Sequence, residues 1–303
     1  MQMRTTPVIL DTDIGTDIDD TWALAMLLRC PELDLKLVTT ATGDTVYRAK
    51  LAARLLEVAG RPDVPVGIGV PGEMNPKHRT QEPWAAGYDL ARYPGTVNED
   101  GVAALIETIM GSRERVTLIA IGPLTNVAAA LQREPRIAER ARFVGMQGSV
   151  RWSHAQGNQQ IAEYNVKMDV PACQKAFEAG WDKTITPLDT CARVVLAGAK
   201  YAAVAGSADP IARAIIENYE IWKKHGGRSC QEGASSVLYD CVAVYLAFAE
   251  ALLEMRRLKL AVTDDGFTRE DPTGREINVA LAWKNLAAFE DLLVERITRK
   301  GRK

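Results

Sequence analysis

Short apolar runs that alternate with helical patterns are the feature that most constrains the fold of this 303-residue chain. Runs such as 8–10, 34–40 and 116–121 have the length of buried strands, and each precedes a segment with helical spacing of apolar residues. This alternation predicts a mostly parallel sheet with helices on both faces. We therefore expect an α/β fold, with residues 1–303 forming a single domain built on an open, mostly parallel β-sheet flanked by helices.

Polar turns follow several of these strands, at 13–20, 43–44, 122–123 and 147–165. Right-handed crossovers bring the carboxyl ends of parallel strands to one edge of the sheet. Ligands of open α/β sheets bind in the crevice outside those ends. The sequence therefore predicts one crevice, where these turns meet.

The first of these turns is strongly acidic, with five aspartates in ten residues: Asp11, Asp13, Asp17, Asp19 and Asp20. Carboxylates this close repel one another unless they share a cation or are solvated. Oxygen donors without Cys or His suit hard cations such as Ca²⁺ or Mg²⁺. Acidic turns also cap helices and form solvated loops, so a metal site is one of two interpretations. The positions of Gly15 and Trp22 exclude an EF-hand loop.

Two later regions are less regular. The segment 71–101 is rich in proline and glycine, and both a lid over a ligand and a plain surface excursion stay open for it. Further on, helical patterns at 210–224 and 235–253 and extended segments at 259–262 and 276–283 precede a closing helix at 285–298.

The charge balance argues against several classes of partner. Lys and Arg number 37 against 39 for Asp and Glu, with no long block of one sign. This disfavours a dedicated nucleic-acid or membrane-surface binder. Five dispersed cysteines without a CxxC pair are typical of reduced thiols, and we find neither a secretory signal nor a run of eighteen apolar residues. We expect a soluble, cytoplasmic protein with no nucleic-acid or membrane partner.

The segment Asp11-Thr12-Asp13-Ile14-Gly15, followed by Asp19-Asp20, resembles the N-terminal signature of the inosine-uridine-preferring nucleoside hydrolases. Later blocks resemble the same family in the right order: 39–44, 121–126, Met146, 162–165 and Tyr239-Asp240. The resemblance implies the Rossmann-like fold of that family and hydrolysis of ribonucleosides to free nucleobase and ribose, as in purine and pyrimidine salvage. It also implies a homo-oligomer, either a dimer or a tetramer.

The resemblance assigns roles by position. It implies Ca²⁺ held by Asp13, Asp20, Asp240 and the backbone carbonyl of Ile121, with Asp13 as the general base that activates water. It places on the substrate a further set of side chains: Asp19, Asp44, Met146, Asn158, Glu163, Asn165 and Tyr239. Within that set, Asp44 stands where the family often has Asn, and the loop that carries Asn158 is one residue shorter here.

Two further departures bear on the chemistry. Two extra residues around Asp17 lengthen the acidic turn, and we expect Asp17 to be a surface carboxylate. Tyr239 stands where the family carries a His that protonates the leaving nucleobase, and a phenol is a weaker acid at neutral pH. Proton donation, stacking on a nucleobase and simple packing all stay open for Tyr239. The three histidines, His78, His154 and His225, lie outside the matching blocks, and we expect them to be structural or at the surface.

Two alternatives to a hydrolase remain. A non-catalytic, Ca²⁺-dependent ribose- or nucleoside-binding protein would also explain Asp44 and Tyr239. A Mg²⁺-dependent phosphatase of the haloacid-dehalogenase type would use Asp11 as its nucleophile, but it gives Glu163 and Asp240 no role. The nucleobase specificity does not follow from the sequence.

Overall fold

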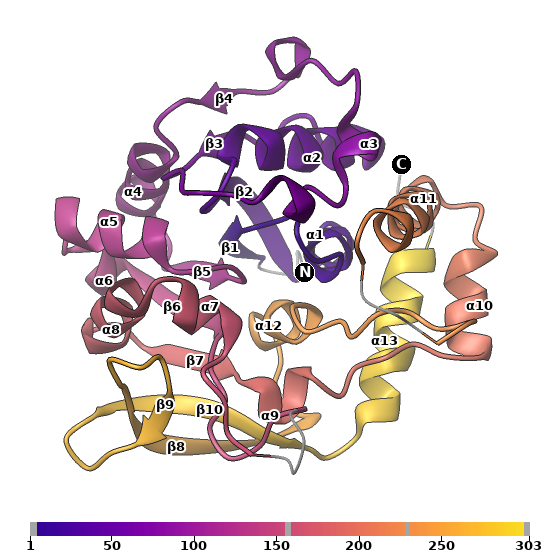
Figure 1. Cartoon of the computed structure of the whole chain (residues 1–303). Helices are drawn as coiled ribbons and strands as arrows, with labels where there is room; N and C mark the ends of the chain where they lie inside the picture. The colour runs from indigo at the N-terminus through magenta and orange to yellow at the C-terminus, as the bar shows by residue number, and fades with distance from the viewer. Residues whose placement is uncertain (1–4, 155–158, 228–230, 300–303) are drawn as a thin grey trace.

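The computed structural model describes residues 5–154, 159–227 and 231–299, and it is built around one ten-stranded sheet (Figure 1). The strand order is β4-β3-β2-β1-β5-β6-β7-β10-β8-β9. The strands are β1 (Thr6–Thr12), β2 (Leu33–Thr40), β3 (Val66–Ile68), β4 (Val97–Asn98), β5 (Val116–Ala120), β6 (Ala141–Met146), β7 (Lys183–Thr186), β8 (Leu253–Val262), β9 (Thr268–Glu270) and β10 (Arg275–Trp283).

Neighbouring strands from β4 to β10 pair in parallel, and only the β10–β8 and β8–β9 pairs at one edge are antiparallel. The expected mostly parallel α/β sheet is therefore confirmed.

Helices and 3-10 turns complete the described chain. They are α1 (Asp19–Leu27), α2 (Thr45–Val58), η1 (Pro76–His78), α3 (Glu82–Ala85), η2 (Leu90–Arg92), α4 (Gly101–Gly111), α5 (Thr125–Arg133), α6 (Ile137–Arg140), α7 (Tyr164–Met168), α8 (Val170–Glu178), α9 (Leu188–Cys191), α10 (Ala199–Ala205), α11 (Pro210–Lys224), α12 (Cys241–Leu246) and α13 (Leu286–Thr298). Within the described ranges, none of the helices has the length and apolarity that a membrane span requires.

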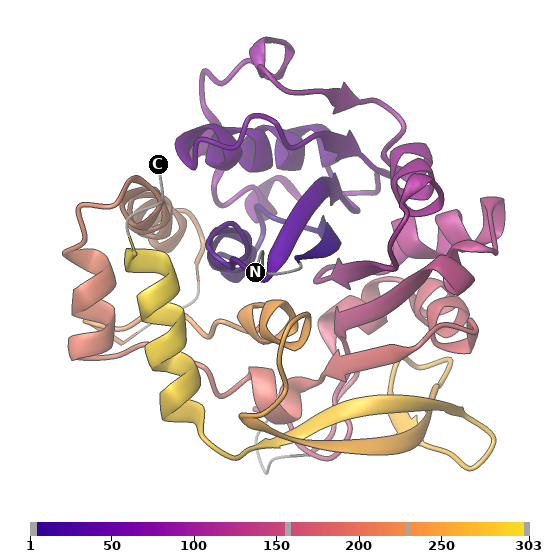
Figure 2. The same cartoon turned by 180° about the vertical axis from the view of Figure 1, so that it is seen from behind.

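Alternate residues of β1 enter two separate cores, as the period of a strand requires. Val8 and Leu10 belong to the core that includes residues of α1, α2, α11, α12 and α13, whereas Ile9 belongs to the core that includes residues of α4, α5 and α8. Figures 1 and 2 show how these helices surround the sheet. Because both faces of the strand are buried, β1 is apolar at successive positions.

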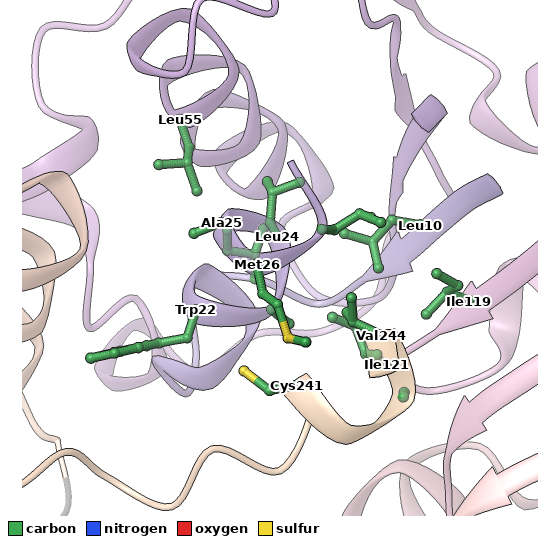
Figure 3. Packing of buried hydrophobic residues seen from close by; sticks show 14 of the residues in the cluster. Leu10, Trp22, Leu24, Ala25, Met26, Leu55, Ile119, Ile121, Cys241 and Val244 are labelled. Atoms are coloured by element: carbon green, nitrogen blue, oxygen red, sulfur yellow. The ribbon is translucent and has the colours of Figure 1, made fainter. Parts of the chain in front are cut away.

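Helix α1 is buried along its whole length, in keeping with its uniformly apolar sequence after Asp20. Figure 3 shows Met26 of α1 beside Cys241 of α12, and Val244 of α12 beside Ile121 at the end of β5. The start of α12 also lies next to the start of α1, because one carboxylate oxygen each of Asp19, Asp20 and Asp240 lies within 4.8 Å of the other two.

The helix predicted at 235–253 is wrong in extent, because only Cys241–Leu246 is α-helical. The preceding residues run extended beside an earlier segment: the N–H of Ser235 donates to the carbonyl of Leu196 (2.8 Å), and that of Leu238 to Val194 (2.9 Å). Leu253 already belongs to β8. Tertiary pairing thus overrides the local helical pattern on both sides of α12.

Candidate active site

The acidic turn lies at the topological switch point of the sheet. Strands β1 and β5 are neighbours in the sheet, and the chain leads from β1 to β2 on one side and from β5 to β6 on the other. Outside the carboxyl end of β1 is a cavity of about 350 Å³. This is where an open α/β sheet binds its ligand.

Nine of the eleven residues assigned to the site from the sequence line this cavity: Asp13, Asp19, Asp20, Ile121, Met146, Glu163, Asn165, Tyr239 and Asp240. Asp44 is not among the lining residues. Its carboxylate caps α2 by accepting the N–H of Tyr47 (2.9 Å) and pairs with Arg79. Asn158 lies outside the described residues.

Three buried carboxylates form the centre of the cavity. One oxygen each of Asp19, Asp20 and Asp240 lies within 4.8 Å of the other two. Burial, together with repulsion from neighbouring aspartates, raises the pKa of all three well above the usual value for Asp. An all-oxygen donor set of this kind fits a hard divalent cation, which would offset the repulsion. Asp19, assigned to the ribose from the sequence, belongs to this group, whereas Asp13 lines the same cavity outside it.

Asp13 faces a buried guanidinium. Nη2 of Arg48 lies 3.8 Å from Oδ2 of Asp13, and the same group donates to the backbone carbonyls of Asp13 and Ile14 and, through Nε, to that of Thr42 (2.8 Å). Burial raises the pKa of Asp13, and the positive charge of Arg48 opposes this effect. Arg48 therefore fixes the turn and favours the ionised form of Asp13.

Side chains from three distant segments brace the backbone carbonyls of residues 15–17. Tyr47 of α2 donates to the carbonyl of residue 15 (3.0 Å), and Trp222 of α11 donates to that of residue 16 (3.2 Å). Thr80 donates to the carbonyl of residue 16 (2.8 Å), and Gln81 to that of residue 17 (2.6 Å). The long excursion between β3 and α4 thus contacts the acidic turn through two buried residues.

The opposite wall of the cavity comes from the segment before α7. The carboxylate of Glu163 accepts backbone N–H groups from Gly148 (2.9 Å) and Asn165 (2.8 Å), and burial raises its pKa to about 7. Asn165 donates through Nδ2 to the carbonyls of Ile121 (3.1 Å) and Met146 (3.0 Å). This amide therefore links the ends of β5 and β6 at the cavity.

Asp11 has a structural position behind the cavity. Its Oδ1 accepts the hydroxyl of Thr39 and the amide of Asn126 (2.7 Å), and the side chain is fully buried. Because Asp11 is not among the cavity residues, it has no access to a phosphate ester as a nucleophile. The phosphatase alternative therefore has no nucleophile in the cavity.

Asp17 and His154 are among the residues that line the cavity without having been assigned to it from the sequence. Asp17 is half-buried there, and its charge raises the pKa of both Asp13 and Asp19, so the expectation of a surface carboxylate is wrong. His154 is exposed, as expected for a histidine at the surface, but it also lines the cavity beside Tyr239, where no histidine was expected. The five clustered aspartates were a usable signal for Asp17, but nothing local to His154 distinguishes it from His78 or His225.

Solved structures of other proteins share this architecture. A plant nucleoside hydrolase superposes with a TM-score of 0.83 at 22% identity over 98% of this chain and 100% of that chain. An inosine-uridine preferring nucleoside hydrolase from Bacillus anthracis gives 0.79 at 19% identity over 97% and 100%. These likenesses establish that the fold is shared.

Curated relatives are similar at the level of sequence. A non-specific ribonucleoside hydrolase RihC of Klebsiella pneumoniae subsp. pneumoniae is 35% identical over 199 residues, an alignment that covers 63% of this chain and 64% of that protein. A pyrimidine-specific ribonucleoside hydrolase RihA of the same organism is 28% identical over 313 residues, covering 96% and 98%. The family model for inosine-uridine preferring nucleoside hydrolases matches residues 8–290. The chain belongs to the inosine-uridine-preferring nucleoside hydrolase family, which confirms the resemblance seen in its sequence blocks.

Proposed function

We propose that the protein hydrolyses the N-glycosidic bond of ribonucleosides and releases free nucleobase and ribose. The observation that carries this proposal is the convergence of Asp13 and the carboxylate group Asp19, Asp20 and Asp240 on one cavity at the switch point. Membership of the family and the names of the relatives support the same reaction.

The resident cation in this proposal is Ca²⁺, held by Asp13, Asp20, Asp240 and the carbonyl of Ile121, with Asp19 close enough to join them. When bound, Ca²⁺ would supply positive charge that lowers the pKa of water and orients ribose hydroxyls. The donor set fits this ion because every ligand atom is an oxygen.

Side chains of the protein take the remaining roles in proton transfer, charge stabilisation and ribose binding. Asp13 accepts a proton from the water that attacks the anomeric carbon of ribose. Positive charge develops on the sugar ring as the bond breaks, and the carboxylates around the cavity stabilise it. Glu163 and Asn165 hydrogen-bond ribose hydroxyls, and Met146 lines the sugar pocket. Asp44 has no place in this set because it caps α2.

The nucleobase specificity is open within the family, because the relatives are named non-specific, pyrimidine-specific and purine-preferring. A homo-oligomeric state and a cytoplasmic location stay predictions from the sequence, as does a ribose contact for Asn158.

The test is release of reducing sugar from a panel of purine and pyrimidine ribonucleosides with added Ca²⁺. We expect measurable ribose from at least one substrate, and Asp13→Ala should lower the rate by about 10²–10⁴-fold, the contribution typical of a general base. Asp182→Ala, at an exposed position, is the control. The panel also includes a riboside with a good leaving group, and if ribonucleosides bind but no ribose appears from any member of the panel, the non-catalytic binding protein is the correct interpretation.

A further inference from the structure

The departing nucleobase needs a proton, and this inference therefore rests on the hydrolysis proposed above. Breaking the bond to ribose leaves an electron pair on a ring nitrogen, and a positioned acid that protonates it contributes about 10²–10⁴-fold in rate. The aspartates around the cavity are suited to accept protons and to stabilise positive charge. Burial raises the pKa of Glu163 to about 7, but both of its oxygens accept backbone N–H groups, which favours the ionised form over proton donation. The donor in this inference therefore comes from another part of the wall.

His154 and Tyr239 form an aromatic pair on that wall. Both line the cavity, their ring centroids are 6.2 Å apart, and their planes are inclined by 59°. Tyr239 directly precedes Asp240, so the pair borders the carboxylate group. Free imidazole has a pKa near 6.5, against about 10 for a free phenol and 10.4 for a free lysine amine. His154 is the donor best matched to neutral pH.

The chain that leads to His154 is held by a buried carboxylate. Asp189 accepts the backbone N–H groups of Val150 (2.9 Å), Arg151 (2.8 Å) and Trp152 (3.1 Å). The guanidinium of Arg193 covers the Trp152 ring at 4.1 Å. This anchor holds the backbone up to two residues before His154, whose exposed imidazole lies beside the ring of Tyr239.

We propose that His154 protonates the departing nucleobase and that the ring of Tyr239 positions the imidazole at the cavity. The bond between the anomeric carbon and the nucleobase nitrogen breaks, its electron pair stays on nitrogen, and that nitrogen takes the proton of the imidazolium. The oxygen of water bonds to the anomeric carbon and gives a proton to Asp13. Solvent then carries this proton from Asp13 to His154, so one water molecule is added across the bond.

Two substrates separate this role from a structural one. Inosine or uridine needs a protonated leaving group, whereas p-nitrophenyl β-D-ribofuranoside releases a phenolate that is stable without a proton. We expect His154→Gln to lower kcat/KM on the better natural nucleoside by about 10²–10⁴-fold, and on the nitrophenyl riboside by no more than a few-fold. His225→Gln, at an exposed residue at the end of α11, is the matched control and should change neither rate.

Substitutions of Tyr239 test the positioning role. Tyr239→Leu removes the ring and should reproduce part of the selective loss on the natural nucleoside, and Tyr239→Phe, which keeps the ring, should lose less. If His154→Gln is harmless and Tyr239→Phe carries the loss, the hydroxyl of Tyr239 is the acid and the proposal is wrong.

The remaining outcomes are equally decisive. An equal fall on both substrates with His154→Gln would mean that His154 serves the ribose or the loop, which overturns its role as the acid. If the wild-type protein hydrolyses the nitrophenyl riboside but no natural nucleoside, it is a hydrolase, but His154 does not protonate the departing nucleobase. A wild-type protein inert toward both substrates refutes the hydrolase itself.

Discussion

Arg48 and Asp13 form an ion pair inside the protein, with Nη2 and Oδ2 3.8 Å apart and side-chain exposures of only 3% and 8%. Removing one partner of a buried pair leaves an uncompensated charge and costs about 3–5 kcal/mol. We therefore expect Arg48→Met to lower the free energy of unfolding in urea by that amount. Arg48→Lys should recover only part of it, because one ammonium cannot reproduce the planar guanidinium contacts.

The control for this change is an exposed ion pair. Arg133 pairs with Asp100 at side-chain exposures of 49% and 54%, and such pairs contribute less than about 1 kcal/mol. A loss in Arg48→Met no larger than that in Arg133→Met would mean that the buried guanidinium does not hold the turn.

The carboxylate group predicts opposite effects of one substitution with and without metal. Asp240→Asn removes one of three repelling charges, so we expect a higher Tm than wild type in chelator. The same change removes a ligand, so the rise in Tm on adding Ca²⁺ should shrink. A site that binds only the folded state contributes about 2.7 kcal/mol when Ca²⁺ is at 100 times Kd. A wild-type Tm that is the same in Ca²⁺ and in chelator would count against the metal site.

Asp11 predicts how stability changes with pH. Burial raises its pKa from 3.8 to about 7, so the folded chain binds this proton more tightly than the unfolded chain does. The stabilisation is therefore complete below pH 3.8 and is lost as the pH rises toward 7. We expect Asp11→Asn to flatten the fall in unfolding free energy between pH 5 and 7, measured in chelator. Asp271→Asn, at an exposed carboxylate whose pKa is lowered, should leave that slope unchanged.

The position of Gly15 in the acidic turn leads us to expect that a side chain there destabilises the protein. Its φ is +114°, and a Cβ atom there would lie 2.6 Å from Cε1 of Tyr47 and 2.8 Å from Cδ1 of Leu51. Gly60→Ala provides the comparison, because Gly60 also has a positive φ (+69°) but no atom within 4 Å of the added carbon. We expect about 1–2 kcal/mol of destabilisation for Gly60→Ala, and a larger loss for Gly15→Ala in thermal or urea unfolding. Equal losses would mean that the Tyr47 contact is easily relieved.

Local signals were sufficient for much of the fold. The helix at 210–224 was predicted from its helical pattern, and the structure shows that Asp209 caps it and Pro210 begins it. The parallel strands β1, β2 and β5 were likewise predicted from short apolar runs that precede polar turns. The region around α12 was not, because its neighbours are set by pairing with residues 194–197.

The candidate site was predictable where chemistry is clustered in the sequence. Asp13, Asp19 and Asp20 stand together in one turn, and the blocks that carry Glu163 and Asp240 resemble a known pattern. His154 lines the cavity two residues after Trp152, whose backbone N–H donates to Asp189, and the local sequence does not show this contact across 37 positions. Asp44 was assigned to the substrate but does not line the cavity, because its carboxylate pairs with Arg79 in the segment between β3 and α4. The local sequence does not show this contact.

The braced carbonyls of residues 15–17 have a consequence for assembly. The donors come from α2, from residues 80–81 and from α11, so the shape of the turn depends on hydrogen bonds from three segments that are far apart in the sequence. Local opening of any one of them would release the turn while most secondary structure persists. Catalytic turnover should therefore disappear earlier in a denaturant titration than helical circular dichroism does.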